Sequence, residues 1–233
     1  MRFFDQYRRF YETTGTLLKP NRFQQRWRII IDENKAVLRG ARVLDIASHD
    51  GRWSFAVLKA GASYVEGVEA RPELVARARH TFPYYGIAQS AYSFLCQDAL
   101  QYLAASRLPQ FDIVLLLGFF YHTLKHLEIL ENVERTGARL IIIDTGVAAD
   151  EEPVIRVGLE DANDIRNAVD HRSSGAGMVP VGLPSREALR LMLDWIGFDF
   201  GEIDWRDRVA DFTECEDYYS GARGTFLAAR RTL

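Results

Sequence analysis

The sequence has few cysteines, no long apolar run and no large excess of charge of either sign. Its two cysteines among 233 residues, Cys96 and Cys215, have the spacing of neither a metal site nor a redox motif. Cys96 lies in an apolar run, so we expect it to be buried. The most apolar stretch, residues 111–121, is too short to cross a bilayer, and no signal peptide is visible. These features predict a cytoplasmic, reduced globular protein without membrane insertion.

Two features are abundant, namely aromatic rings and charges of opposite sign at the two ends. The chain has 14 Phe, 10 Tyr and 4 Trp residues, and the rings are dense near the N-terminus. Residues 1–28 carry seven basic and two acidic side chains, whereas residues 199–217 carry eight acidic and two basic ones. With a net charge of −3, a uniformly basic nucleic-acid binder is disfavoured. The opposed segments suggest contacts within the chain or between subunits of a homo-oligomer.

The hydrophobic pattern divides the chain into a helical extension, residues 1–38, and an α/β domain, residues 39–233. Lys19-Pro20-Asn21 breaks the extension into two predicted helices. In the domain, continuous apolar runs alternate with helical segments, which is typical of a parallel sheet covered on both faces. Expected strands are 42–46, 64–68, 92–96, 112–117, 139–143, 202–205 and 225–230. Expected helices are 52–59, 72–82, 99–105, 124–134 and 185–196.

Residues 145–184 form an insertion with no clear period, rich in Gly, Ser, Asp and Asn. A gap of this length in a compact domain is typical of a functional lid or of disorder.

Small and acidic residues follow the predicted strands at the points where those strands end. The stretch 43–52 is a strand, a turn of small residues and a helix start, a form in which a ligand can approach the backbone. It lacks the full G-x-G-x-x-G pattern of dinucleotide binding. Glu69, Asp98 and the pair Leu117-Gly118 follow the next three strands. Ligands of open α/β sheets bind at these strand ends, so the sequence predicts one site there.

These four stretches resemble class I S-adenosylmethionine-dependent methyltransferases over residues 41–144. The resemblance implies a doubly wound, seven-stranded, mostly parallel sheet, with the methionine moiety of the donor at the first turn. It implies a ribose-binding role for Glu69 and an adenine-edge role for Asp98. Where the family commonly has three glycines, this chain has Ala47, His49 and Gly51. The donor-binding residues expected from the resemblance are Asp45, Ala47, Ser48, His49, Gly51, Glu69, Asp98, Ala99, Leu117 and Gly118.

Histidine suits removal of a proton from an oxygen acceptor, because its ordinary pKa of about 6.5 lies near neutrality. His122 follows the fourth strand, in the segment that lines the methyl-transfer site according to the resemblance. His171 lies beside Asp170 in the insertion, and Asp144 ends the fifth strand. We expect His122, His171 and Asp144 to be catalytic. Alternatively, Asp144, Asp170 and His171 bind a Mg²⁺-like ion.

Several acceptor classes remain open. Residues 116–127 are similar to methyltransferases of two kinds, which act on sugar hydroxyls or on the wobble uridine of tRNA. The basic N-terminus could contact tRNA phosphates. We favour O-methylation of a small polar acceptor, a sugar or oligosaccharide, with nucleic acid as the less favoured partner. His49 in the first turn also suggests a third interpretation, a nucleotide-binding protein without turnover.

Overall fold

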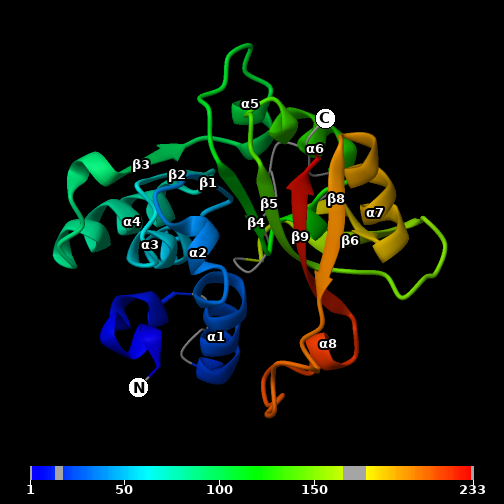
Figure 1. The fold of residues 1–233 in the computed structure, drawn as a ribbon, viewed down its shortest axis with the longest axis horizontal. Coiled ribbons are helices and arrows are strands. Elements are labelled where there is room, and N and C mark those ends of the chain that lie inside the picture. The colour runs from blue at the N-terminus through cyan, green and yellow to red at the C-terminus, as the bar shows by residue number, and fades with distance from the viewer. Residues whose placement is uncertain (1, 14–17, 165–176, 232–233) are drawn as a thin grey trace.

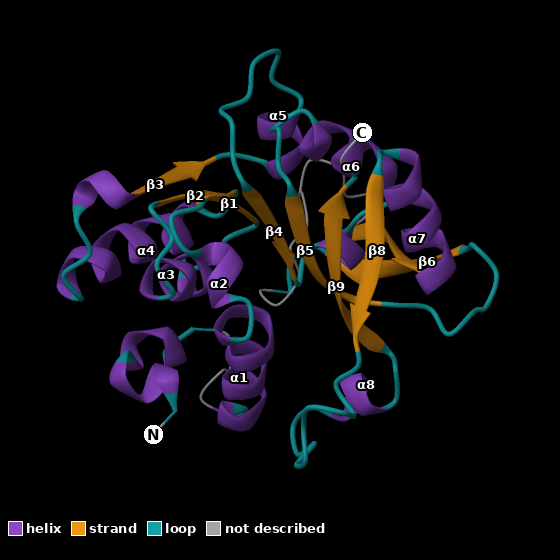
Figure 2. Ribbon diagram, in the orientation of Figure 1, coloured by secondary structure: helices purple, strands orange, loops and turns teal. Residues whose placement is uncertain are grey.

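A mixed seven-stranded sheet forms the centre of the molecule. The computed structural model describes residues 2–13, 18–164 and 177–231. The strand order is β3-β2-β1-β4-β5-β9-β8, in which β1 to β5 are parallel and β9 is antiparallel to both of its neighbours (Figures 1 and 2). The predicted doubly wound, mostly parallel sheet is therefore confirmed. The strands are β1 Arg42–Ile46, β2 Tyr64–Glu69, β3 Tyr92–Cys96, β4 Ile113–Leu117, β5 Leu140–Gly146, β8 Phe198–Ile203 and β9 Arg223–Arg230.

Strand register brings the predicted site residues to one edge of the sheet. Asp45 in β1 pairs with Gly67 in β2 and with Leu115 in β4. Leu117, the last residue of β4, pairs with Asp144 near the end of β5. Because all five parallel strands run the same way, the turns that follow them lie side by side, which is where ligands bind in such sheets.

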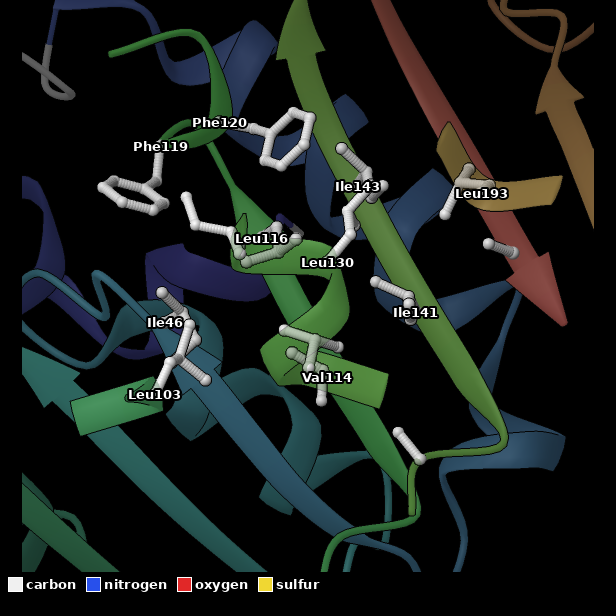
Figure 3. Close-up of a cluster of buried hydrophobic side chains, with 14 of the residues drawn as sticks. Ile46, Leu103, Val114, Leu116, Phe119, Phe120, Leu130, Ile141, Ile143 and Leu193 are labelled. Carbon is white, nitrogen blue, oxygen red and sulfur yellow. The ribbon is translucent and has the colours of Figure 1, made fainter. Parts of the chain in front are cut away.

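Successive side chains of each strand point to opposite faces of the sheet and pack in two separate hydrophobic cores. In β4, Val114 and Leu116 face the core under α5, α6 and α7, whereas Ile113 and Leu115 face the core under α3 and α4. Figure 3 shows the first of these cores, where Leu116 and Ile143 lie among side chains from the covering helices. Continuous apolar strands are required because both faces are covered. The helices are α3 Arg52–Lys59, α4 Pro72–Tyr84, α5 Ala99–Leu103, α6 His126–Glu134, α7 Arg186–Trp195 and α8 Glu216–Tyr219, with short 3₁₀ turns η5 Gln89–Ala91 and η6 Phe120–His122.

In the N-terminal extension, the part before Lys19-Pro20-Asn21 forms short 3₁₀ turns instead of the expected amphipathic helix, whereas the part after it is helical as expected. Aromatic packing explains the difference, because Phe3 stacks on Trp27 with ring centroids 4.7 Å apart and Phe4 stacks on Phe23 at 3.8 Å. These rings continue into the core that contains Phe55. The aromatic surplus therefore serves as core. The elements are the 3₁₀ turns η1 Phe3–Gln6 and η2 Arg8–Tyr11, α1 Pro20–Arg26, the π-helical turn η4 Trp27–Asp32 and α2 Lys35–Leu38.

The basic and acidic segments meet within the chain. The Arg22 guanidinium binds both carboxylate oxygens of Asp217 at 2.5 and 2.7 Å. One step earlier in α1, the backbone N–H of Asn21 donates to Glu214. The charge of α1 is thus directed towards the acidic region around α8, beside which it lies.

The insertion contains a hairpin that the sequence analysis missed. β6 Ile155–Asp161 and β7 Met178–Pro184 pair antiparallel, and β7 packs on η6. Three apolar residues, Ile155, Val157 and Leu159, alternate along β6, but they are exposed. Because the apolar side chains of β6 face solvent, a prediction that looks for a buried apolar face does not identify this strand.

Two further expectations differ from the structure. β8 begins at Phe198, four residues before the predicted start, because Phe198 and not the acidic stretch after it fills the core. Cys96 is exposed and Cys215 is buried, because Cys96 ends the edge strand β3. Within the described ranges, no helix is long and apolar enough to cross a membrane.

Candidate functional site

The turn after β1 has the left-handed backbone of a glycine-rich loop, although two of its three expected glycines are replaced. Ala47 and His49 both have φ of 55°, and Gly51 has φ of 78°. Left-handed backbone costs a residue with a side chain about 1 to 2 kcal/mol. The path of the loop is therefore kept, and the strain is concentrated where we expect a ligand.

Gly51 is required for two reasons. Besides its positive φ, a Cβ atom there would lie 2.8 Å from Phe94 Cζ and 2.9 Å from Phe82 Cε2. Both rings are buried and pack edge-to-face on each other. The start of α3 thus approaches β3 and α4 more closely than any side chain would allow.

Asp45 supports this turn from β1. Its carboxylate is buried and accepts a hydrogen bond from Ser54 Oγ of α3 at 2.6 Å. Burial raises the pKa of Asp45 to about 7, although the Ser54 bond opposes the shift. The carboxyl therefore ties β1 to α3 and titrates near neutrality.

Glu69, the predicted ribose ligand, lies directly beside the turn. One oxygen accepts the backbone N–H of His49 at 3.0 Å, and the other accepts Arg71 Nε at 2.8 Å. The side chain is only 4% exposed. Two further bonds come from Arg71, through its backbone N–H at 3.1 Å and its Nη2 at 3.4 Å, so hydroxyl groups of a ligand would have to displace Arg71 from these oxygens.

Polar atoms at the same turn lack partners. Ser48 Oγ and His49 Nε2 are buried without a hydrogen-bond partner in the described part of the chain. The His49 ring is fixed through Nδ1, which lies 3.3 Å from Asp50 and 3.2 Å from Arg52 Nη2. Burial and then Arg52 lower the pKa of His49, so its imidazole is neutral at pH 7. Unsatisfied polar atoms at a strand end fit a polar ligand.

The remaining donor-site predictions lie at the same edge. Asp98 caps α5 by accepting the N–H of Gln101 at 2.9 Å, and it is half-buried next to the buried Ala99. Leu117 is buried at the end of β4. Gly118 follows with φ of 87° and donates its N–H to the carbonyl of Asp144.

Asp144 is fully buried and hydrogen-bonded by four side chains. The carboxylate accepts Arg26 Nη2 at 3.0 Å, Arg223 Nε at 2.7 Å, Tyr218 OH at 2.8 Å and Thr225 Oγ1 at 2.9 Å. Burial alone would raise the pKa of Asp144, but Arg223 and Arg26 outweigh it and hold the pKa well below its usual range. A carboxylate in this state accepts protons poorly, so the geometry favours the role of an orienting acid over that of a base.

His122 is paired with a carboxylate that the sequence analysis did not identify. Its Nδ1 lies 2.5 Å from Glu160 Oε2, a residue of β6. Nε2 has no hydrogen-bond partner among the described residues, and the side chain is only 4% exposed. Burial lowers the pKa of His122 below its ordinary value, although Glu160 opposes the shift. The alternation of apolar residues along β6 could have identified this strand from the sequence. It would then have placed Glu160 on the opposite face from the apolar side chains.

The other predicted catalytic and metal residues, Asp170 and His171, lie outside the described residues. In the described ranges, no group of three or more His, Cys, Asp or Glu side chains could hold a metal ion. The set of Asp144, Asp170 and His171 therefore stays a prediction, with Asp144 already engaged by two arginines.

A cavity of about 620 Å³ opens between α7, β8 and α8. Its wall is polar and carries the buried, stacked pair Trp205 and Tyr218, whose ring centroids are 3.5 Å apart. Arg223 lines this cavity and also lies against the turn after β4, because its Nη2 is 3.5 Å from the position of a Cβ on Gly118. The cavity and the strand-end site thus share Arg223.

A family described as "Methyltransferase domain" matches residues 43–137, the stretch that holds β1 to β4 and their turns. This match identifies the chain as an S-adenosylmethionine-dependent methyltransferase. The comparison with curated proteins finds no matching sequence.

Solved structures similar to this methyltransferase share its fold at low identity. The N-terminal domain of EvdMO1, crystallised in the presence of SAH and D-fucose, is 18% identical with a TM-score of 0.63, covering 86% of this chain and 81% of that one. Magnesium protoporphyrin IX methyltransferase from Synechocystis PCC 6803 with bound SAH is 18% identical with a TM-score of 0.62, covering 98% and 94%. The [4+2]-cyclase SpnF is 15% identical with a TM-score of 0.61, covering 90% and 82%. The fold therefore accommodates different chemistry.

Replacement of Gly51 tests the close approach at the turn. Gly51→Ala should lower the free energy of unfolding by about 3 kcal/mol or more, because backbone strain and overpacking add. Gly86→Ala is the matched control, since Gly86 has φ of 71° but no atom within 4 Å of a Cβ. The control should cost only about 1 kcal/mol in urea unfolding. Equal losses for the two variants would contradict the close approach.

Asp45 should make stability depend on pH. Its pKa is about 7 in the folded protein and about 3.9 when unfolded, so the folded state binds more protons in this window. Stability from this group is therefore lost as the pH rises. As the pH rises from 5 to 8, the free energy of unfolding of Asp45→Asn should therefore increase by about 2 to 3 kcal/mol relative to that of the wild type. Urea unfolding at both pH values measures this, with Asp32→Asn as the exposed control; a constant difference would contradict the prediction.

Proposed function

We propose that this methyltransferase transfers a methyl group to a hydroxyl oxygen of a small polar acceptor, a sugar or oligosaccharide. The observation that supports this most directly is the His122–Glu160 pair beside the turn after β4, in which His122 Nε2 has no hydrogen-bond partner among the described residues. A hydroxyl must lose its proton on methylation, and an imidazole oriented by a carboxylate is suited to accept it.

The donor would occupy the turns after β1 to β4. S-adenosylmethionine supplies a methyl group on a cationic sulfur. Glu69 would accept the ribose hydroxyls, Asp98 would meet the adenine edge, and the turn containing Ser48 and His49 would hold the methionine end. The two buried orphan atoms of that turn fit such a polar group.

The chain's role in the reaction is alignment and proton removal. His122 Nε2 would take the hydroxyl proton while the oxygen forms its bond to the methyl carbon, and the electron pair of the broken carbon–sulfur bond stays on sulfur. Glu160 would hold Nδ1–H and stabilise the imidazolium that results. Because burial keeps the free imidazole neutral, His122 is ready to accept a proton at pH 7.

The cavity beside Arg223 would take the acceptor. Arg186, Glu202 and Asp204 line it and can bind hydroxyls, while the exposed Tyr219 provides ring surface. The fold shared with EvdMO1, whose crystals contain D-fucose, supports a carbohydrate acceptor. The tRNA alternative is weaker, because Arg22, Arg26 and Arg28 form ion pairs within the chain.

Calorimetry tests donor binding. S-adenosylhomocysteine should bind the wild type, and Glu69→Gln should weaken binding 10- to 100-fold, because charge-assisted bonds to the ribose are lost. Glu66→Gln is the control on the same strand, since Glu66 bonds Tyr102 instead. Absence of binding to the wild type would overturn the assignment.

The ionisation of His122 tests the proposed base. In an NMR titration, the His122 resonances, identified by their loss in His122→Gln, should report a pKa below 6.5. Glu160→Gln should lower this pKa further, because a carboxylate stabilises the imidazolium. Glu66→Gln should leave it unchanged. An identical His122 pKa in wild type and Glu160→Gln would show that the pair does not control the base.

A further inference from the structure

The polar cluster around Asp144 contains one more positive charge than negative charge. Arg26 and Arg223 contribute two guanidinium groups, and both pair with the single carboxylate of Asp144. Arg22 is matched to Asp217 by two hydrogen bonds. Arg26 and Arg223 therefore share the single charge of Asp144, and Arg223 and Asp144 are buried.

Arg26 also has hydrogen-bonding capacity that the chain does not use. Its Nη2 donates to Asp144, but its Nε is buried without a partner in the described ranges. The guanidinium lies 4.9 Å from the ring centroid of Trp53. A buried donor without a partner costs free energy, which a bound acceptor atom would remove.

The surplus charge lies beside the proposed methyl-transfer site. A Cβ on Gly118 would be 3.5 Å from Arg223 Nη2 and 3.9 Å from Arg26 Nη2. Arg223 also lies 5.3 Å from the ring centroid of Tyr121, which in turn packs on His122 at 4.0 Å. The carboxylate of Glu160 is bonded to His122. The two arginines and the proposed base therefore surround the same turn.

An unmatched buried cation next to a cationic donor is electrostatically unfavourable, and a negatively charged acceptor would relieve it. We propose that the acceptor carries an acidic group, a carboxylate or a phosphate, that Arg26 and Arg223 bind while His122 faces the hydroxyl to be methylated. The planar guanidinium suits both groups, because it donates parallel hydrogen bonds to two oxygens. This inference rests on the proposed function and narrows its substrate class to acidic sugars and related small acids.

The test compares charged and neutral probes in protein saturated with S-adenosylhomocysteine. Calorimetry with glucuronate, glucose 1-phosphate and glucose should show at least 10-fold tighter binding of one charged probe than of glucose. Arg26→Gln should remove this preference, because a charge-assisted bond is lost. This variant leaves Arg223 and Asp144 matched one to one, so its melting temperature should show a folded protein. The comparison of glucuronate with glucose 1-phosphate separates carboxylate from phosphate.

Arg28→Gln is the matched control, since Arg28 lies in the same segment and forms an ion pair with Glu33. It should keep the preference for the charged probe. Equal binding of charged and neutral probes, no binding of either charged probe, or an unchanged preference in Arg26→Gln would overturn the inference while donor binding stands. Binding of tRNA that Arg26→Gln weakens, without binding of the small acids, would likewise overturn it. Loss of donor binding in the wild type would instead overturn the proposed function.

Discussion

The buried carboxylate of Asp144 is the interaction on which the arrangement of this methyltransferase depends. Four donors from three elements converge on it, namely Arg26 of α1, Tyr218 of α8, and Arg223 and Thr225 of β9. Removing one partner of a buried ion pair leaves an uncompensated charge and costs several kcal/mol. The ends of the chain are therefore fixed against the end of β5, and the turn after β4 is fixed with them through the Gly118–Asp144 backbone bond.

The donor side of the site is built by different means. Its turn is strained at Ala47 and His49, and the strain is balanced by bonds that only this backbone path permits, such as that from His49 N–H to Glu69. Strain of this kind persists where the surroundings determine the conformation. Replacement of two expected glycines thus changes which side chains line the turn without changing its path.

The sequence predicted what depends on local pattern. Strands β1 to β5 lie close to their expected positions, because strands buried on both faces read as continuous apolar runs. The pattern failed at η1 and η2, where ring stacking decides the backbone, and at β6, whose apolar face is exposed. Burial of Cys215 rather than Cys96 likewise depends on sheet order, which the local sequence does not contain.

Of the site, the strand-end positions could be predicted, because topology alone brings them together. The pairings could not. Glu160 lies 38 residues from His122, and Arg26 lies 118 residues from Asp144, so no spacing rule connects them. Asp144 lies near the end of β5 as expected, but the two arginines that neutralise it were visible in the sequence only as part of a general charge asymmetry.

The Arg26–Asp144–Arg223 cluster has a consequence for how such a protein can diversify. Residues 43–137 contain every predicted donor ligand in one continuous segment, whereas Arg26, Glu160 and Arg223 come from the flanking segments. In the proposed mechanism, the donor ligands and the base His122 thus come from one segment, whereas the arginines and Glu160 come from the flanks. Substitutions in the flanks can exchange one substrate for another while the shared donor machinery is inherited intact, as is common where function is grafted onto a widely used fold.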